Sequence, residues 1–275
     1  MFGENYRKHI KPLPLGTTWI TLRNDNSADN GASDLCLEVT LIPAEHCLGS
    51  VMFLFRTRDM TILFTGDFRF DTNDIPNIDQ LHTDGKPIQI DVMYVDTTFQ
   101  ANEQYANAEF PNRRYAVECA IVEMKNWLDK NENNCIALSP PAKIGYEEVF
   151  NSIYNHLGYK VYVRDEVRKY YTEIQEVLDV TTDDLNSRVH FCSDKMENGF
   201  HVNCKINRYN KTFLYVRLSA YKWGNWNTNQ NVICYENQKR LNVCFATHCS
   251  SSELKAFVNY FAPKKIVGFS EEYRG

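Results

Sequence analysis

The chain has 275 residues, of which 43% are hydrophobic, and carries a formal net charge of −5. This length and apolar content allow one large domain or two small ones with a sizeable core. No run of roughly 18 apolar residues occurs, so no membrane-spanning helix is predicted. The negative charge argues mildly against a nucleic-acid binder, although a local groove can be positive on an acidic protein.

The number of cysteines and the N-terminal sequence together indicate the redox compartment of the protein. There are nine of them, and Met1–Gly16 has no apolar centre that would make it a secretory signal. We therefore expect reduced intracellular thiols rather than disulfides. An odd number of cysteines also cannot pair completely within one chain.

The first hundred residues predict a β-sheet. Short runs rich in β-branched and aromatic residues alternate with turn-forming segments, and each run has the length of a strand. The expected strands are Thr17–Leu22, Leu35–Pro43, Ser50–Phe55, Thr61–Thr65 and Ile88–Val95.

Polar side chains stand at the ends of these strands. His46 lies just before Ser50–Phe55, and Asp67 lies just after Thr61–Thr65, behind Gly66. Paired strands bring such loop ends to one rim of a sheet, where an imidazole and a carboxylate suit Zn²⁺ or Mn²⁺. Taken alone, the two residues fit better a hairpin with a hydrogen-bonded histidine and a turn aspartate, because such pairs are common. Asp96, in an Asp-Thr-Thr sequence after the last strand, is read alone as a turn or helix cap.

From Phe99 onward the pattern changes to alternating helices and strands, which predicts a parallel α/β layer. The expected helices are Asn112–Lys130, Gly145–Leu157, Glu166–Leu178 and Glu253–Phe261, the last capped by Ser252 and stopped before Pro263. The expected strands are Cys135–Ser139, Val161–Val163, Thr212–Leu218 and Asn242–Ala246.

Two further groups carry candidate chemistry. His190 and Cys192 project from one side of a strand, with Cys204 twelve residues later, and imidazole plus thiolates is zinc chemistry. Two buried thiols and a strand histidine fit that pattern equally well. Lys222 and Trp223 are candidates for substrate binding, by stacking on bases or backing a phosphate groove, although tryptophans in such places are commonly buried structure.

Four blocks of sequence carry a family resemblance: AEHCLGSVMF, ILFTGDFRF, MYVDTTF and FATHCSSSELKAFVNYFAP. In this order they resemble the metallo-β-lactamase nucleases with an inserted β-CASP domain, and within them the Artemis-like DNA cross-link repair nucleases. The implied fold is α/β, a partial metallo-β-lactamase αββα sandwich with an inserted β-CASP α/β domain. The implied division is residues 1–99 for the metallo-β-lactamase part, 100–240 for the insertion and 241–275 for the return segment.

The resemblance also implies roles for individual residues. His46 and Asp67 correspond to zinc ligands, and Asp67 would bridge if two ions bind. Asp96 would orient a ligand or water beside the metal, and His248 would contact the phosphate or its leaving oxygen. A second, structural zinc would lie at His190, Cys192 and Cys204.

The implied second zinc site is not complete in this sequence. The family's fourth ligand there is a histidine, where this chain has Tyr162. His201 is the candidate to replace it.

The family's HxHxDH signature, which supplies most of its metal ligands, is not found. The seven histidines are 9, 46, 82, 156, 190, 201 and 248, and no two are separated by a single residue. A truncated gene model, an internal start or a divergent chain would each explain this, and we expect truncation at the N-terminus. With His46 and Asp67 alone, weak or no metal binding at this site is predicted, with any zinc at His190, Cys192 and Cys204 instead, and no cleavage by this chain.

The function implied is that of a metal-dependent DNA exonuclease or endonuclease in the nucleus, acting in non-homologous end joining and interstrand cross-link repair. Its partners would be broken or damaged DNA and a DNA-dependent protein kinase, with no membrane involved. Two alternatives stay open: a non-catalytic DNA- or partner-binding fragment, and a small-molecule metallo-hydrolase of the lactamase fold.

Overall fold

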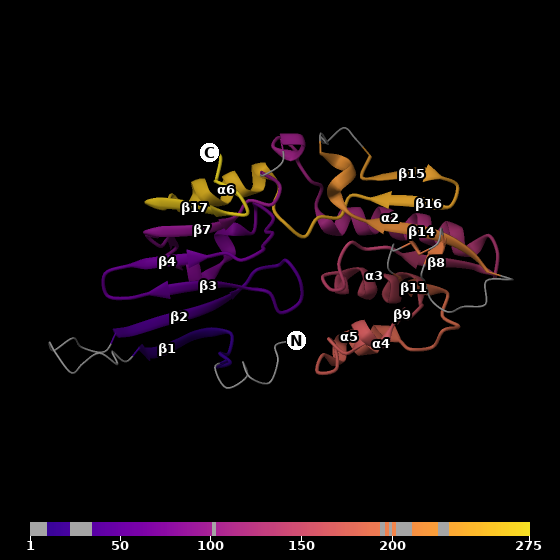
Figure 1. Cartoon of the computed structure of the whole chain (residues 1–275), viewed down its shortest axis with the longest axis horizontal. Coiled ribbons are helices and arrows are strands. Elements are labelled where there is room, and N and C mark those ends of the chain that lie inside the picture. The colour runs from indigo at the N-terminus through magenta and orange to yellow at the C-terminus, as the bar shows by residue number, and fades with distance from the viewer. Residues whose placement is uncertain are drawn as a thin grey trace. The chain divides into compact units, whose positions relative to one another are not determined.

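The computed structural model describes residues 10–22, 35–100, 103–192, 196–197, 200–201, 211–224 and 231–275. The chain forms two compact units, and each has its own main sheet (Figure 1). Unit 1 contains Met1–Ala101 and Ser252–Gly275, and unit 2 contains Asn102–Ser251. The expected α/β class is confirmed, whereas the expected domain boundaries at 99 and 240 stay predictions.

Unit 1 is built on a six-stranded sheet in the order β1-β2-β3-β4-β7-β17. Strands β1 to β4 are antiparallel neighbours, and β7 is parallel to both β4 and β17. The strands are β1 (Gly16–Leu22), β2 (Leu35–Pro43), β3 (Val51–Arg56), β4 (Thr61–Phe64), β7 (Val92–Asp96) and β17 (Lys265–Phe269).

The two faces of this sheet are packed differently. Because side chains alternate along a strand, one face collects the fully buried Met52, Leu54, Leu63 and Met93. The opposite face carries a partly exposed aromatic ladder, in which the Phe64 and Phe269 rings stack with centroids 5.1 Å apart. The core of unit 1 therefore lies on one side of the sheet.

Helix α6 (Ser251–Phe261) belongs to unit 1 through its packing. The ring of Phe257 meets the ring of Phe68 edge-on at 5.0 Å, and both side chains are fully buried. Tyr260 extends the contact by a 2.9 Å hydrogen bond between its hydroxyl and His82 Nε2. The helix thus brings the C-terminal part of the chain against the loop that follows β4.

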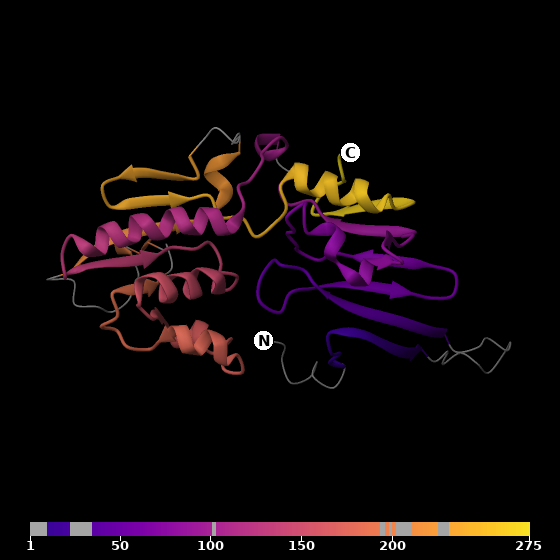
Figure 2. The same ribbon diagram turned by 180° about the vertical axis from the view of Figure 1, so that it is seen from behind.

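Unit 2 is a seven-stranded sheet in the order β10-β9-β11-β8-β14-β16-β15, parallel except for β15. Figure 2 shows the larger helices of this unit on one face of its sheet. The strands are β8 (Asn134–Leu138), β9 (Val161–Val163), β10 (Thr181–Thr182), β11 (Val189–Phe191), β14 (Thr212–Leu218), β15 (Ile233–Asn237) and β16 (Arg240–Val243). The helices are α2 (Arg113–Asp129), α3 (Glu147–Leu157), α4 (Asp165–Arg168) and α5 (Gln175–Val180).

Short elements complete the described chain. They are the strands β5 (His82–Thr83), β6 (Lys86–Pro87), β12 (Met196–Glu197) and β13 (Phe200–His201), with 3-10 helices at Ile75–Asn77, Asp79–Leu81, Glu103–Tyr105 and Ala220–Trp223. Within the described ranges, no helix is both long and apolar enough to cross a membrane.

One expected strand lies in the other sheet. The strand expected at Asn242–Ala246 is β16, and it pairs with β14 and β15 in unit 2. The expectation that it returns the chain to the first sheet was wrong. Its buried residues Leu241 and Val243 satisfy the alternation of either sheet, so the pattern could not tell the two apart.

A buried carboxylate anchors the start of α3 in unit 2. Glu147 is 8% exposed, and its Oε1 accepts hydrogen bonds from Gly145 N at 3.0 Å and from the Tyr171 hydroxyl at 2.6 Å. An acidic side chain in the first turn also suits the helix dipole. The carboxylate therefore ties the loop before α3 to the segment between α4 and α5.

We expect Tyr171→Phe to destabilise the protein by roughly 1–3 kcal/mol, because it removes a hydrogen bond from a buried carboxylate. The matched control is Tyr170→Phe, which removes the same hydroxyl from the neighbouring side chain, 46% exposed. Urea denaturation followed by circular dichroism measures both. Equal midpoints for the two variants would contradict a structural role for the Tyr171 hydroxyl.

Candidate metal centre

His46 is held in a tight turn between β2 and β3. The turn closes through a 3.0 Å hydrogen bond from Ala44 N to Ser50 O. The Ser50 hydroxyl accepts from His46 N at 3.2 Å and from Cys47 N at 3.1 Å, and it donates to Cys47 O at 2.8 Å. Gly49 adopts φ +82°, which few other residues tolerate. The backbone of His46 is therefore fixed at the end of the two strands.

Asp67 follows β4 and faces His46. The chain turns at Gly66, which has φ +55°, and a hydrogen bond of 3.1 Å from Arg69 N to Ala44 O joins the two loops. His46 Nε2 and Asp67 Oδ2 lie 4.0 Å apart, with side-chain exposures of 22% and 52%. The pair is thus open to water on at least one side.

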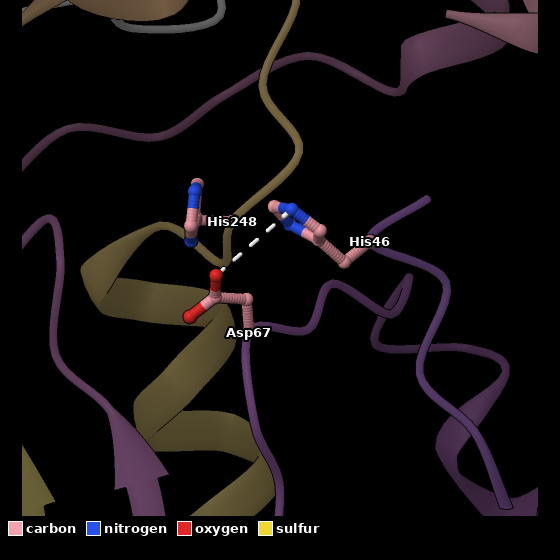
Figure 3. Close-up of side chains that lie close together, drawn as sticks. All are labelled: His46, Asp67 and His248. Carbon is pink, nitrogen blue, oxygen red and sulfur yellow. Dashed lines mark ion pairs between the residues drawn. The ribbon is translucent and has the colours of Figure 1, made fainter. Parts of the chain in front are cut away.

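His248 lies three residues before α6. The division between the units falls within the first turn of that helix, whose body packs on unit 1. One ligand atom from each of His46, Asp67 and His248 lies within 4.8 Å of the others. Figure 3 shows the two imidazole rings directed toward the Asp67 carboxylate.

This donor set fits a divalent transition metal. Two imidazoles and one carboxylate match the three protein ligands of catalytic zinc sites, which leave a position for water or substrate. Bonds of about 2.0–2.2 Å place two ligands of one ion at most roughly 4.4 Å apart. A cluster whose ligand atoms all lie within 4.8 Å of one another needs to contract by at most a few tenths of an ångström to hold one ion.

The family resemblance implies that His248 contacts the phosphate or its leaving oxygen rather than the metal. In the structure, one of its imidazole nitrogens lies among the ligand atoms. A histidine between a buried strand and a helix carries no spacing signal relative to residues about 180 to 200 positions earlier. Only the order of the family blocks indicated that these residues belong together.

Asp96 is buried at the end of β7 and is 3% exposed. Its Oδ1 accepts from Thr98 N at 2.8 Å and from Thr98 Oγ1 at 2.5 Å, and its own N–H donates to Thr65 Oγ1 at 3.3 Å. One carboxylate oxygen therefore shapes the turn after the strand. Among the described residues, Asp96 is not part of the ligand cluster.

The second predicted zinc site is only partly described. His190 is fully buried on β11, and its Nε2 donates to Ser187 O at 2.6 Å. Its ring lies 4.9 Å from that of Tyr162, the residue standing where the family has a histidine ligand. Burial lowers the pKa of the His190 imidazole, so the neutral form that a metal ligand requires is favoured.

Cys192 is disulfide-bonded, which corrects the expectation of reduced thiols at this position. A sulfur in a disulfide is not the thiolate that zinc binds, so zinc binding by Cys192 requires the reduced form. Cys204 and the side chain of His201 lie outside the described residues. Among the described residues, the cysteines that are not in a disulfide are Cys36, Cys47, Cys119, Cys135, Cys234, Cys244 and Cys249.

Lys222 and Trp223 are both engaged within unit 2. Lys222 Nζ forms a 2.9 Å ion pair with Glu236 Oε2. Trp223 is 7% exposed, and its indole N–H donates to Asn231 O at 3.1 Å. In this conformation the indole does not offer an open face for a base, because it is packed in the protein.

Comparisons with known proteins agree on one family. The DNA repair metallo-beta-lactamase family model matches residues 173–270. Artemis from Mus musculus is 32% identical over 235 residues, covering 83% of this chain and 33% of the mouse protein. Artemis from Homo sapiens is 30% identical over 266 residues, covering 94% of this chain and 37% of the human protein.

More distant proteins extend the match. The DNA cross-link repair 1A protein of Homo sapiens is 28% identical over 274 residues, covering 94% of this chain and 24% of that protein. A crystal structure of a protein of unknown function from Enterococcus faecalis V583 superposes with a TM-score of 0.51 at 13% identity, over 84% of this chain and 58% of that one. This last match concerns the fold alone.

The chain spans about a third of the length of the Artemis proteins it matches. The two-sheet α/β fold is consistent with a metallo-β-lactamase domain carrying a β-CASP-like unit. The family model, the identities and the coverage of this chain together place the protein in the Artemis and DNA cross-link repair family.

Proposed function

We propose that this chain contributes to the active site of a metal-dependent nuclease that hydrolyses phosphodiester bonds in broken or cross-linked DNA. The observation that carries the proposal is the cluster of His46, Asp67 and His248 in a member of this family. Relatives named Artemis and DNA cross-link repair proteins support DNA as the substrate. Roles in end joining, a kinase partner and a nuclear location belong to the same proposal.

The roles of the residues follow from their chemistry. His46, Asp67 and His248 would hold a divalent ion, which supplies Lewis acidity and lowers the pKa of water. Asp67 brings the only negative charge of the three, and its 52% exposed side chain lies where substrate can reach it. The backbone N–H of Asp96 is held by a hydrogen bond to Thr65, and its carboxylate would orient a ligand or water beside the metal.

The chain holds only part of the family's ligand set, since it has no HxHxDH sequence. We propose that cleavage requires those additional ligands and that this chain alone binds metal and DNA without cutting. In the same proposal, unit 1 corresponds to the metallo-β-lactamase part, and unit 2, whose sheet includes β16, corresponds to the β-CASP insertion. The alternatives to this proposal are a purely non-catalytic fragment and a small-molecule hydrolase. The experiments below distinguish them from a nuclease.

The proposed metal centre predicts how substitutions change zinc binding. Isothermal titration with Zn²⁺ should show binding that is lost or weakened at least about tenfold in His46→Ala, Asp67→Asn and His248→Ala, because each removes one of three ligands. The matched control is His156→Ala, which removes an exposed histidine from the last turn of α3.

If His156→Ala weakens binding as much as the three cluster variants do, zinc is bound at scattered surface histidines and the site is wrong. If His248→Ala alone leaves binding unchanged, His248 returns to the substrate-facing role that the family resemblance implied. Both results are read from the same titrations.

The second prediction concerns cleavage. The chain extended at its N-terminus by a segment that carries an HxHxDH sequence should cut 5′-phosphorylated DNA only with metal present, and Asp67→Asn should abolish cutting. Loss of the carboxylate removes both a ligand and the charge that sets the ligand geometry. The chain without this extension should be inactive in the same assay.

Gel analysis of DNA products measures this cleavage, with lactam and thioester substrates assayed beside it. Turnover of the small substrates without DNA cleavage would favour a small-molecule hydrolase. Metal-dependent DNA cleavage by the chain without the extension would show that its three ligands suffice.

The third prediction concerns the second zinc site. After reduction, the chain should take up zinc that Cys192→Ser does not, because only the free thiolate is a ligand. Elemental analysis measures the difference, with Cys36→Ser as the control at an exposed free thiol. Equal zinc in all reduced proteins would remove this site from the proposal.

A further inference from the structure

A buried ion pair joins the loop of Asp67 to the helix that follows His248. Arg69 is 5% exposed, and its guanidinium donates from Nη2 to Glu253 Oε1 at 2.9 Å and from Nε to Glu253 Oε2 at 3.2 Å. The Glu253 side chain is 16% exposed. Two parallel hydrogen bonds of this kind fix the mutual orientation of the groups as well as their distance.

Arg69 connects all three segments of the ligand cluster. It lies two residues after Asp67, and its backbone N–H donates to Ala44 O, two residues before His46. Glu253 lies in the first turn of α6, five residues after His248. Phe68, between Asp67 and Arg69, also packs against α6, because its ring contacts the ring of Phe257.

The contribution of such a pair is geometric more than energetic. Removing two charges from water costs several kcal/mol per ion, and their attraction in the interior only approximately offsets that cost. A buried ion pair is therefore weak evidence for stability. Its orientation is strongly defined, however, because misplacing either group leaves a buried charge without its hydrogen bonds.

The ligand cluster tolerates little displacement. Its ligand atoms all lie within 4.8 Å of one another, which is close to the roughly 4.4 Å that two bonds to one ion can span. A functional constellation needs its groups within about 0.5 Å of the productive geometry. A small shift of the start of α6 relative to the Asp67 loop would carry His248 out of ligand range.

We infer that the Arg69–Glu253 ion pair is a positioning element that holds the three ligand side chains at metal-binding distance. Arg69 acts on the site through Asp67 and Ala44 on one side and through α6 on the other. The inference rests on the proposed metal centre and deepens it, by naming the group that sets its geometry.

The chain offers a matched control. Arg56 Nη1 and Glu38 Oε1 form an ion pair at 3.3 Å between neighbouring strands β3 and β2, with side-chain exposures of 34% and 17%. This pair ties only two strands that already share a ladder of backbone hydrogen bonds. Its loss should leave the ligand spacing unchanged.

The test is a titration of the full chain with Co²⁺, followed by visible absorption, which reports both affinity and coordination geometry. Arg69→Met and Glu253→Gln should each weaken binding about 10–100-fold and alter the absorption band, as expected when a group that orients metal ligands is removed. Arg69→Lys should recover part of the affinity, since it keeps the charge without the planar fork. Arg56→Met should bind as the unaltered chain does.

The double variant Arg69→Met/Glu253→Met separates positioning from stability. Removing both charges leaves no unpaired ion in the interior, so its urea midpoint should return close to that of the unaltered chain. Its Co²⁺ affinity should nevertheless stay about 10–100-fold weak, because the orienting link is gone. This outcome also covers the case in which a single variant fails to fold.

Unchanged affinity and spectrum in the folded Arg69 and Glu253 variants, beside normal binding by the unaltered chain, would overturn the positioning role alone. Recovery of affinity together with stability in the double variant would also overturn it. Absence of Co²⁺ binding by the unaltered chain would overturn the proposed metal centre, and this inference with it.

Discussion

The organisation of unit 1 depends on the pairing of its last strand with β7. Strand β17 runs parallel to β7 from Lys265 beside Val92 to Phe269 beside Asp96. Thr97 extends this strand pairing, because its hydroxyl hydrogen is shared between Phe269 O at 2.7 Å and Glu271 O at 2.9 Å. With β17 in place, α6 is held against the loop after β4, and residues from both ends of the sequence form one core.

Contacts within unit 1 also join the segments that precede and follow unit 2 in the sequence. The segments of His46 and Asp67 are joined by the Arg69–Ala44 hydrogen bond, and α6 is joined to them by Arg69–Glu253 and by Phe68–Phe257. Each link lies within unit 1. The positions of His46, Asp67 and the start of α6 therefore rest on contacts within unit 1.

Local patterns and tertiary contacts account for what the sequence could and could not predict. The strands of unit 1 and the helices α2 and α3 were predictable because their periodicity is local and their ends carry turn or capping residues. The single helix expected at Glu166–Leu178 is instead two short helices, α4 and α5. The sheet to which β16 belongs was not, since Leu241 and Val243 would be buried in either one. The link between Arg69 and Glu253 was also invisible, because no local pattern connects an arginine in a turn with a glutamate in a helix that follows much later.

In the candidate site, too, some residues could be predicted from local sequence and others depend on tertiary contacts. His46 and Asp67 could be read from strand ends, and the family resemblance added Asp96 and His248. The ligand position of His248 depends on where α6 begins in space, which no spacing rule provides. Trp223 illustrates the opposite error, because an aromatic residue beside a lysine resembles a stacking surface until burial shows that the indole is packed inside unit 2.

Charge at the candidate site differs from the charge of the whole protein. The net charge of −5 is spread over the chain, whereas the cluster contains one carboxylate and two imidazoles, which are neutral when they act as ligands. A divalent ion held there would leave a local excess of about one positive charge, and over a few ångströms at a partly exposed surface that excess outweighs distant screened charges. A ligand set poor in carboxylates therefore suits an anionic substrate such as a phosphodiester. The acidity of the chain as a whole does not argue against that substrate, because the relevant potential is set within about one Debye length of the site.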